Sequence, residues 1–388
     1  MIFDFPVLQF IWWVLVGAVL IIYSTTAGFD FGVTMLMPFM NRHPKFKDND
    51  AERRLILNTI APTWDGNQTW LVFAGGALFV IWPAVYGAVF SGLYFLMFTI
   101  LWAFFLRPPG FDYREKLPSQ GWRTTWDWAL LISAILPVFS FGLIIGNLFL
   151  GLPLAYDPIL LRSFYLGTFL GLFHPFAVVC GIAAVFMCLM HGTAYLNRRT
   201  EADLKEFFQS LQSKFTIMFL IMMTLAGLML MHIPGYILLA MPSQPTLDPL
   251  HNVVAVAPGL WWQSIVLSPF KILPVVLIYL FAILSLSTKR LGSGHLSFWL
   301  SGATIAATII LFGATLFPFI VPSSINPAQS LTVWNATSAQ YTLMGMFYIC
   351  LFFLVIIFIY KFWAFSMLWR DKKTLNTKDV AKNSHHFY

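Results

Sequence analysis

The fold is decided by a polar stretch between two apolar runs, Ala61-Pro62-Thr63-Trp64-Asp65-Gly66-Asn67-Gln68-Thr69-Trp70. A polar side chain in hydrocarbon must find a hydrogen-bonding partner and a charged one is costly there, so this stretch should face protein or water. If one helix spans it, Asn58, Asp65 and Thr69 share a stripe at i, i+7 and i+11. Pro62 then leaves a backbone carbonyl without its helical donor near Asn58. The sequence therefore predicts a polar stripe within an apolar helix.

The composition of the chain indicates a polytopic membrane protein. Of its 388 residues, 59% are hydrophobic and 10% are charged, whereas soluble domains carry about 25% charged residues. The mean hydropathy is +0.76. The net charge of +7 does not indicate nucleic-acid binding, because the positive residues lie in short loops between apolar runs, where they report topology. We expect a lipid bilayer, and no nucleic acid, as a partner.

Nine apolar runs have the length of membrane-spanning helices, which need about 20 residues each. Residues 55–106 cannot form one span, because about 50 helical residues would reach about 75 Å, so we place a break at Ala74-Gly75-Gly76. The sequence predicts one all-α membrane domain over residues 1–388, with helices at about 7–37, 51–73, 78–106, 126–150, 163–195, 215–241, 268–287, 296–321 and 339–369.

The basic residues support nine spans and set their orientation. In this arrangement 21 of the 23 lysines and arginines fall on one side, Lys361 being counted with the C-terminal group, and Arg162 and Lys271 lie elsewhere. Cytoplasmic loops carry an excess of Lys and Arg, so we expect the N-terminus in the periplasm and the C-terminus in the cytoplasm. Eight spans would scramble this segregation.

Two acids, Asp30 and Asp65, lie at membrane depth in the predicted helices. Intramembrane acids often serve as proton relays, ion ligands or partners of a buried base, and the alternative is an acid whose hydrogen bonds fix helix packing. We take both as candidates for a proton route. Arg107 closes the third predicted helix, where it can pair with a carboxylate or a haem propionate, or act as a snorkelling topology anchor.

Histidine and cysteine offer little for a metal or haem site in this chain. A haem held by two imidazoles needs both at one depth on facing helices. His174 is expected in mid-helix, His191 near the inner end and His232 near the outer end. The three cysteines lie in apolar runs without metal-ligand spacing, which predicts buried, inert thiols. We therefore assign no cofactor-binding or metal residue.

Several motifs resemble those of subunit II of the cytochrome bd quinol oxidases. The resemblance runs over nearly the whole chain, and the blocks Trp64–Gln68 and Gly110–Arg114 are quite specific in this context. The motifs are Phe10-Ile11-Trp12-Trp13, Gly28-Phe29-Asp30, Trp64-Asp65-Gly66-Asn67-Gln68, Ala74-Gly75-Gly76-Ala77-Leu78-Phe79, Arg107-Pro108, Gly110-Phe111-Asp112-Tyr113-Arg114, Gly146-Asn147, Phe317-Pro318 and Pro322-Ser323-Ser324.

The resemblance implies a function that depends on a second chain. In this family an obligate partner of similar fold, subunit I, carries two b-type haems, one d-type haem and the quinol site. The complex oxidises quinol and reduces dioxygen to water with protons from the cytoplasm, so it generates a proton-motive force without pumping. The family fold is two four-helix bundles plus a peripheral ninth helix, in the bacterial inner membrane. A small accessory subunit is compatible with this assignment.

The resemblance also carries over to single residues. Asp65 matches the acid implied to lie on a proton route toward the haems of the partner, and Arg107 matches the arginine implied to keep the haem region intact. We group Trp64 and Asn67 with Arg107 as support for that region.

Two positions depart from the family pattern. The family commonly has an acid where this chain has Ala27, so a role resting on that acid cannot be carried over. It usually has Trp-Asp where this chain has Trp334-Asn335, and an asparagine can cap a helix but carries no charge.

Two other classes of function stay open at this point. A secondary transporter would suit broken helices and midplane acids. A cytochrome that binds its own haem through His174 or His232 is the third reading. Co-purification with a haem-bearing membrane protein, seen as visible absorbance, separates the oxidase from a colourless transporter.

Overall fold

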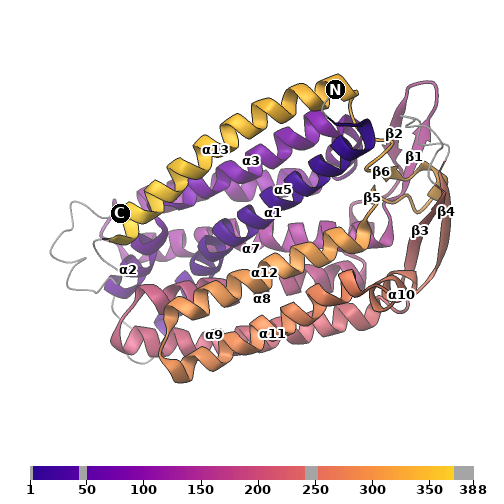
Figure 1. The fold of residues 1–388 in the computed structure, drawn as a ribbon. Coiled ribbons are helices and arrows are strands. Elements are labelled where there is room, and N and C mark those ends of the chain that lie inside the picture. The colour runs from indigo at the N-terminus through magenta and orange to yellow at the C-terminus, as the bar shows by residue number, and fades with distance from the viewer. Residues whose placement is uncertain (1–2, 43–49, 241–251, 371–388) are drawn as a thin grey trace.

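The computed structural model describes residues 3–42, 50–240 and 252–370, and within them the chain is mostly helical (Figure 1). In the described part of the first half, every element of secondary structure is a helix. Its elements are α1 (Phe5–Leu36), the 3-10 helix η1 (Met37–Arg42), α2 (Asp50–Ile60), α3 (Trp64–Ile81), α4 (Pro83–Gly92), α5 (Tyr94–Phe105), α6 (Arg107–Tyr113) and α7 (Gln120–Leu150).

The second half combines long helices with three antiparallel two-stranded hairpins, which lie together at one end of the molecule, on the right of Figure 1. Its elements are β1 (Leu154–Asp157), β2 (Arg162–Tyr165), η3 (Leu170–Phe173), α8 (Pro175–Arg199), α9 (Ala202–Met229), β3 (Pro234–Ala240), β4 (Val253–Pro258), α10 (Leu260–Val266), α11 (Pro269–Leu291), α12 (Gly294–Leu316), β5 (Phe319–Val321), η5 (Pro327–Gln329), β6 (Leu331–Thr332) and α13 (Gln340–Arg370).

Eight helices among the described residues are long and apolar enough to cross a membrane. The pair α3 and α4 passes the same test but is bent by 119°, and counting it as one span gives nine. Length and composition thus agree with the expected helical membrane protein. The hairpin end and the N-terminus lie at one end of the helices, and α2 and the described end of α13 lie at the other, which we call the inner end (Figure 1).

Two predicted boundaries in the first half are wrong, and the residues expected as one helix over 78–106 form the end of α3, α4 and α5. The helix expected over 51–73 is two helices, because α2 ends at Ile60 and Pro62, which has no N–H to donate, lies in the turn before α3. The break expected at Ala74-Gly75-Gly76 is absent, since α3 runs on to Ile81 and the chain bends at Pro83. A consequence is that Asn58, on α2, is buried while Asp65, on α3, is exposed, so the predicted stripe does not form.

Two helices predicted in the second half have other bounds in the structure. The helix expected over 163–195 begins at Pro175, because β2 and η3 occupy the residues before it. The helix expected over 215–241 lies at Ala202–Met229, and its predicted end is the strand β3. A proline stands at the first position of both α8 and β3, where its missing N–H costs nothing.

Helix α1 is the centre of the packing. It contacts α3, α7, α8 and α12, while α13 touches the rest mainly through α1 and α3. Gly32 of α1 and Gly192 of α8 meet so closely that a Cβ on Gly32 would lie 2.9 Å from the Gly192 Cα. Helices α1 and α7 contact α8 as extensively as they contact their own neighbours, so the division into two four-helix bundles stays a prediction.

Candidate functional site

Asp30 lies in the core of the molecule and is bonded to the polar stretch. The part of α1 from Ala27 to Leu36 is buried on every side, and Asp30 has no exposed surface. Asn67, on the first turns of α3, donates from Nδ2 to Asp30 Oδ2 at 2.6 Å and to the Thr26 carbonyl at 3.2 Å. The structure therefore joins two of the predicted site residues, which lie far apart in the sequence.

Arg107, the first residue of α6, is also in the core, with 1% of its surface exposed. Its guanidinium carbon lies 4.7 Å from the ring centre of Phe31, 5.6 Å from that of Trp64 and 5.7 Å from that of Phe111. Trp64 stacks on Phe111 with the ring centres 4.7 Å apart. An aromatic box of this kind stabilises a cation through the ring faces, so Arg107 is not a snorkelling anchor.

These polar groups are close to one another but incompletely bonded. Arg107 Nη1 lies 3.5 Å from Thr34 Oγ1, and Arg107 Nε and Nη2 have no hydrogen-bonding partner among the described residues. The same holds for Asp30 Oδ1 and Asn67 Oδ1. The charges of Asp30 and Arg107 attract each other without a direct ion pair. We call Asp30, Phe31, Trp64, Asn67, Arg107 and Phe111 the Arg107 cluster.

Asp65 occupies a different environment, although it is two residues from Asn67. It lies in the first turn of α3, where the helix dipole favours a negative charge, and its side chain is exposed on the surface of the chain. Lys361 of α13 donates to the backbone carbonyl of Gly66 and interacts electrostatically with Asp65 and Asp30. The two predicted acids therefore lie one in the core and one at the surface.

The face of α3 that carries Asp65 is open along its length. Thr69 is exposed, Val72 is 74% exposed and Phe79 is 59% exposed. A Cβ added at Gly76 would meet no atom within 4 Å. A mostly apolar helix face with an acid at one end is thus available on this chain.

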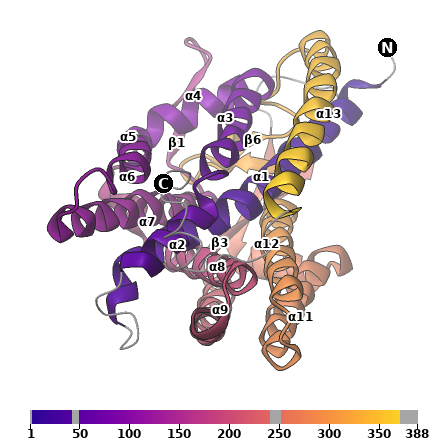
Figure 2. The same ribbon diagram turned by 90° about the vertical axis from the view of Figure 1, so that its left-hand side faces the viewer.

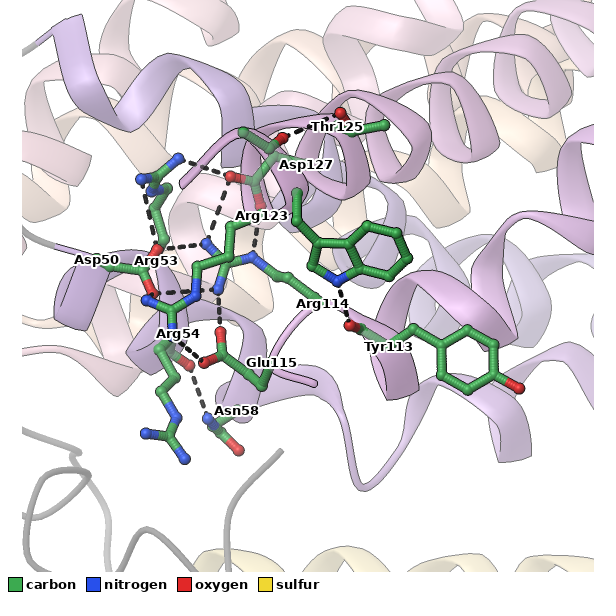
Figure 3. Close-up of polar contacts among 12 residues, drawn as sticks. Asp50, Arg53, Arg54, Asn58, Tyr113, Arg114, Glu115, Arg123, Thr125 and Asp127 are labelled. Atoms are coloured by element: carbon green, nitrogen blue, oxygen red, sulfur yellow. Dashed lines mark hydrogen bonds and ion pairs between the residues drawn. The ribbon is translucent and has the colours of Figure 1, made fainter. Parts of the chain in front are cut away.

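A second group of charges lies at the inner end and is joined by direct ion pairs (Figure 3). Arg114, directly after α6, donates from Nε to Asp127 Oδ1 at 2.6 Å and from Nη2 to Asp50 Oδ1 at 2.6 Å. Arg53 donates to Asp127 Oδ2 at 2.7 Å and Arg123 to Asp50 Oδ2 at 2.9 Å. We call Asp50, Arg53, Arg114, Glu115, Arg123 and Asp127 the inner-end charge cluster.

This cluster ties α2, α6 and α7 together. Arg114 and Asp127 have no exposed side-chain surface, whereas the Asp50 side chain is 23% exposed. Burial alone raises the pKa of Asp50, but the Arg114 hydrogen bond and the charges of Arg114, Arg123 and Arg53 outweigh it and hold the pKa below its ordinary value. Sequence reasoning missed these residues, although Arg114 ends the Gly110–Arg114 block.

The three histidines considered as haem ligands occupy three different settings. His191 Nδ1 lies 2.7 Å from Ser301 Oγ and Nε2 lies 3.0 Å from the Thr25 carbonyl, so both ring nitrogens are used. His174 is not in mid-helix as expected; it caps α8 by accepting from the Phe176 N–H. His232 follows the end of α9 and is exposed. Within the described ranges, no group of three His, Cys, Asp or Glu residues could hold a metal ion.

An apolar cavity of about 420 Å³ lies between α1, α7, α8, α9 and α12. Tyr23, Phe141 and Phe219 are among its lining residues, as are two of the three buried cysteines, Cys180 and Cys188. Neither Asp30 nor Asp65 lines it. The cavity suits an apolar molecule and does not place a substrate against the acids, as a transporter built on them would require.

Comparisons with known proteins place the chain in a family. Residues 8–368 match the family described as cytochrome bd terminal oxidase subunit II. The chain is 38% identical over 387 residues to "Cytochrome bd-I ubiquinol oxidase subunit 2" of Escherichia coli (strain K12), covering 99% of this chain and 100% of that protein. It is 37% identical over 390 residues to "Probable cytochrome oxidase subunit 2" of Haemophilus influenzae, with the same coverage.

A solved structure agrees at the level of the fold. The structure of bd oxidase from Geobacillus thermodenitrificans contains a chain that superposes with a TM-score of 0.68 at 13% identity, covering 94% of this chain and 100% of the other. The present chain belongs to the cytochrome bd terminal oxidase subunit II family. It is a subunit of a respiratory oxidase complex and a multi-pass protein of the inner membrane.

The two departures from the family pattern occupy structural positions. Ala27 is buried in α1 with no exposed surface. Asn335 precedes α13 by several residues; its Oδ1 accepts from the Thr332 N–H at 2.7 Å and its Nδ2 donates to the Ser330 carbonyl at 3.1 Å. Asn335 thus fixes the turn after β6 and needs no charge to do so.

Proposed function

We propose that the chain is the haem-free subunit of a quinol:oxygen oxidoreductase, and that it supplies a proton route through Asp65 to the haem-bearing subunit I. The observation that carries this proposal is the exposure of Asp65 on a membrane-spanning face. A carboxylate in contact with acyl chains is costly. A second polypeptide must therefore cover this face in the membrane.

We propose the open face of α3 as the surface that binds subunit I. It offers apolar contact area at Val72 and Phe79, and close approach at Gly76. Small residues at a helix surface let a second membrane helix pack tightly. Asp65 lies at the inner end of this face. Bound subunit I would enclose the acid between the two subunits, and the carboxylate would stay within reach of cytoplasmic water.

The proton route would start at Asp65 and pass next to the buried Arg107 cluster. Asn67 connects the first turns of α3 to Asp30, whose second oxygen has no partner within the described part of the chain. Buried polar atoms of this kind are usually served by ordered water. Arg107 would keep the cluster electrically balanced opposite Asp30. The route draws on cytoplasmic protons, with the N-terminus in the periplasm and the C-terminus in the cytoplasm.

The cofactors would belong to the partner. Two b-type haems and one d-type haem on subunit I would supply quinol oxidation and dioxygen reduction, and the bonded state of both His191 nitrogens supports placing no haem on this chain. The complex would be electrogenic without pumping. The set of subunits found in the purified complex would also show whether a small accessory subunit is present.

The experiment is Asp65→Asn in the assembled complex, with Asp112→Asn as a control, because Asp112 is an exposed acid on α6. We expect full haem absorbance and a fall in quinol oxidase turnover of at least about tenfold, since a positioned proton-transferring group contributes 10²–10⁴-fold. Unchanged turnover with intact haem spectra would remove Asp65 from the proton path. Loss of haem absorbance would favour a structural role.

A further inference from the structure

Lys361 lies on α13 inside a membrane span and turns toward the protein. The span covers Gln340–Met367, and its side chains near Lys361 mostly face outward: Ile359 is 66% exposed and Phe362 is 80% exposed. A topology anchor would extend its ammonium toward water. The Lys361 ammonium instead donates to the Gly66 carbonyl at the start of α3.

The contact depends on the absence of a side chain at residue 66. A Cβ added to Gly66 would lie 2.6 Å from Lys361 Nζ, closer than a Cβ approaches another atom, so the flexible end of the lysine side chain would have to move. The glycine of the polar stretch therefore leaves the space that the ammonium occupies. Asp65 is the preceding residue, and its charge acts on the Lys361 ammonium without a direct ion pair.

The charged groups around Lys361 come from three elements. Asp65 lies on α3 and Asp30 on α1, and the Lys361 ammonium interacts electrostatically with both. Arg107, at the start of α6, acts on Asp30 from another direction. Lys361 thus interacts with both the surface acid and the core acid.

We propose that Lys361 is a positioning residue for Asp65: fixed on the Gly66 carbonyl, its ammonium serves as the counter-ion of the Asp65 carboxylate and holds the inner half of α13 against α3. The proposal rests on the proposed function for the part that Asp65 plays in proton transfer. An opposite charge nearby lowers the cost of a carboxylate in a low-dielectric setting. Lys361 would keep Asp65 in place on the face that subunit I covers.

The test is a double-mutant cycle in the complete two-subunit complex. Lys361→Met should lower kcat by about threefold to tenfold, toward the lower end of the coupling found between neighbouring residues, with the KM for quinol unchanged. Lys361→Arg keeps the charge and should retain at least about half the activity. In the Asp65→Asn background, Lys361→Met should cause no further loss. Lys271→Met is the matched control, because Lys271 is a partly buried lysine of α11 bonded to Ser264.

A second variant covers the case in which Lys361→Met does not assemble. Gly66→Ala leaves every charge in place but puts a methyl group where the ammonium lies, and alanine favours the helix. We expect the same loss of kcat. Wild-type kcat in both Lys361→Met and Gly66→Ala would overturn the proposal, and so would a loss that is equal in Lys271→Met.

Thermal stability separates this proposal from the proposed function. Lys361→Met and Asp65→Asn should each lower the Tm of the complex by about 1–3 °C, and the double variant should lose no more than the larger single loss. Additive losses contradict the pairing even if Asp65→Asn abolishes turnover. Normal turnover in Asp65→Asn with non-additive Tm losses refutes the proton route and leaves the pairing intact.

Discussion

The short helix α6 carries an arginine at each end, and the two lie in opposite kinds of environment. Arg114 and the other charges of the inner-end charge cluster are joined by direct ion pairs of 2.6–3.4 Å, apart from the Arg114–Glu115 contact. Arg107, at the other end, is equally buried but has two nitrogens without a partner in the described part of the chain. Every nitrogen of the Arg114 guanidinium donates to a carboxylate, which suits a rigid scaffold, whereas the partly bonded guanidinium of Arg107 marks a candidate site of function.

The two clusters also differ in position. The inner-end charge cluster joins α2, α6 and α7 where the helices meet the inner end, seen face-on in Figure 2. The Arg107 cluster lies deeper, between α1, α3 and α6. The inner-end charge cluster therefore lies where it can fix the relative positions of α2, α6 and α7. The Arg107 cluster is held by these helices and their neighbours, close to Asp65.

The largest effect should come from breaking the inner-end charge cluster. Asp127→Asn would leave Arg114 and Arg53 facing a neutral group while both stay buried. Breaking one side of a buried pair costs about 3–5 kcal/mol, so we expect a marked fall in the thermal stability and yield of the complex. The measurement is thermal unfolding followed by haem absorbance, with the exposed Asp112→Asn as the neutral control. An unchanged midpoint would show that the pairs contribute no stability.

A smaller effect should follow in the Arg107 cluster, where the charges do not touch. Arg107→Met removes a charge that balances Asp30 without touching it, so we expect a cost in the range for an unsatisfied buried polar group, about 1–3 kcal/mol. Removing both charges with Asp30→Asn and Arg107→Met should recover much of the stability, since no charge is then left alone. The midpoints of the two single variants and the double variant measure this. A double variant less stable than either single one would contradict the balance of charges.

The smallest effect should be a dependence on pH at the inner end. The pKa of Asp50 is lower in the folded protein than in the unfolded chain, so its contribution to stability is complete above the unfolded value of about 4. It is lost as the pH falls through the lower folded value. We expect no change in Tm from this group between pH 7 and 5, and a fall below about pH 4 that Asp50→Asn reduces. A fall of equal size in Asp50→Asn would assign the acid sensitivity to other groups.

Much of the membrane architecture could be predicted from the sequence. Apolar length predicted the helical spans, while the sidedness of Lys and Arg and the membrane depth of Asp30 and Asp65 stay predictions. The Trp64–Gln68 and Gly110–Arg114 blocks predicted the family. Each of these signals is local in the chain or averages over many residues, which is why a single sequence carries it.

The features that could not be predicted depend on contacts between distant segments or on how a helix is rotated about its axis. Arg53 and Asp127 pair across 74 residues, and periodicity says nothing about such a contact. The positive-inside rule assigned Lys361 to a side of the membrane but not to a face of α13, so its turn toward Gly66 was not predicted. The chain contains several residues that can break a helix, and the sequence alone does not tell which of them does so. The break falls at Pro62 and separates Asn58 from Asp65.

The central claim is that a partner subunit covers the Asp65 face of α3, and cysteine labelling tests it most directly. Val72 of α3 and Val276 of α11 are 74% and 55% exposed on this chain, and their helices lie on opposite sides of the molecule (Figures 1 and 2). In the purified complex, a lipid-soluble maleimide should react with the Val276→Cys variant and leave the Val72→Cys variant protected. Equal reaction at both positions would place the Asp65 face against lipid and contradict the account.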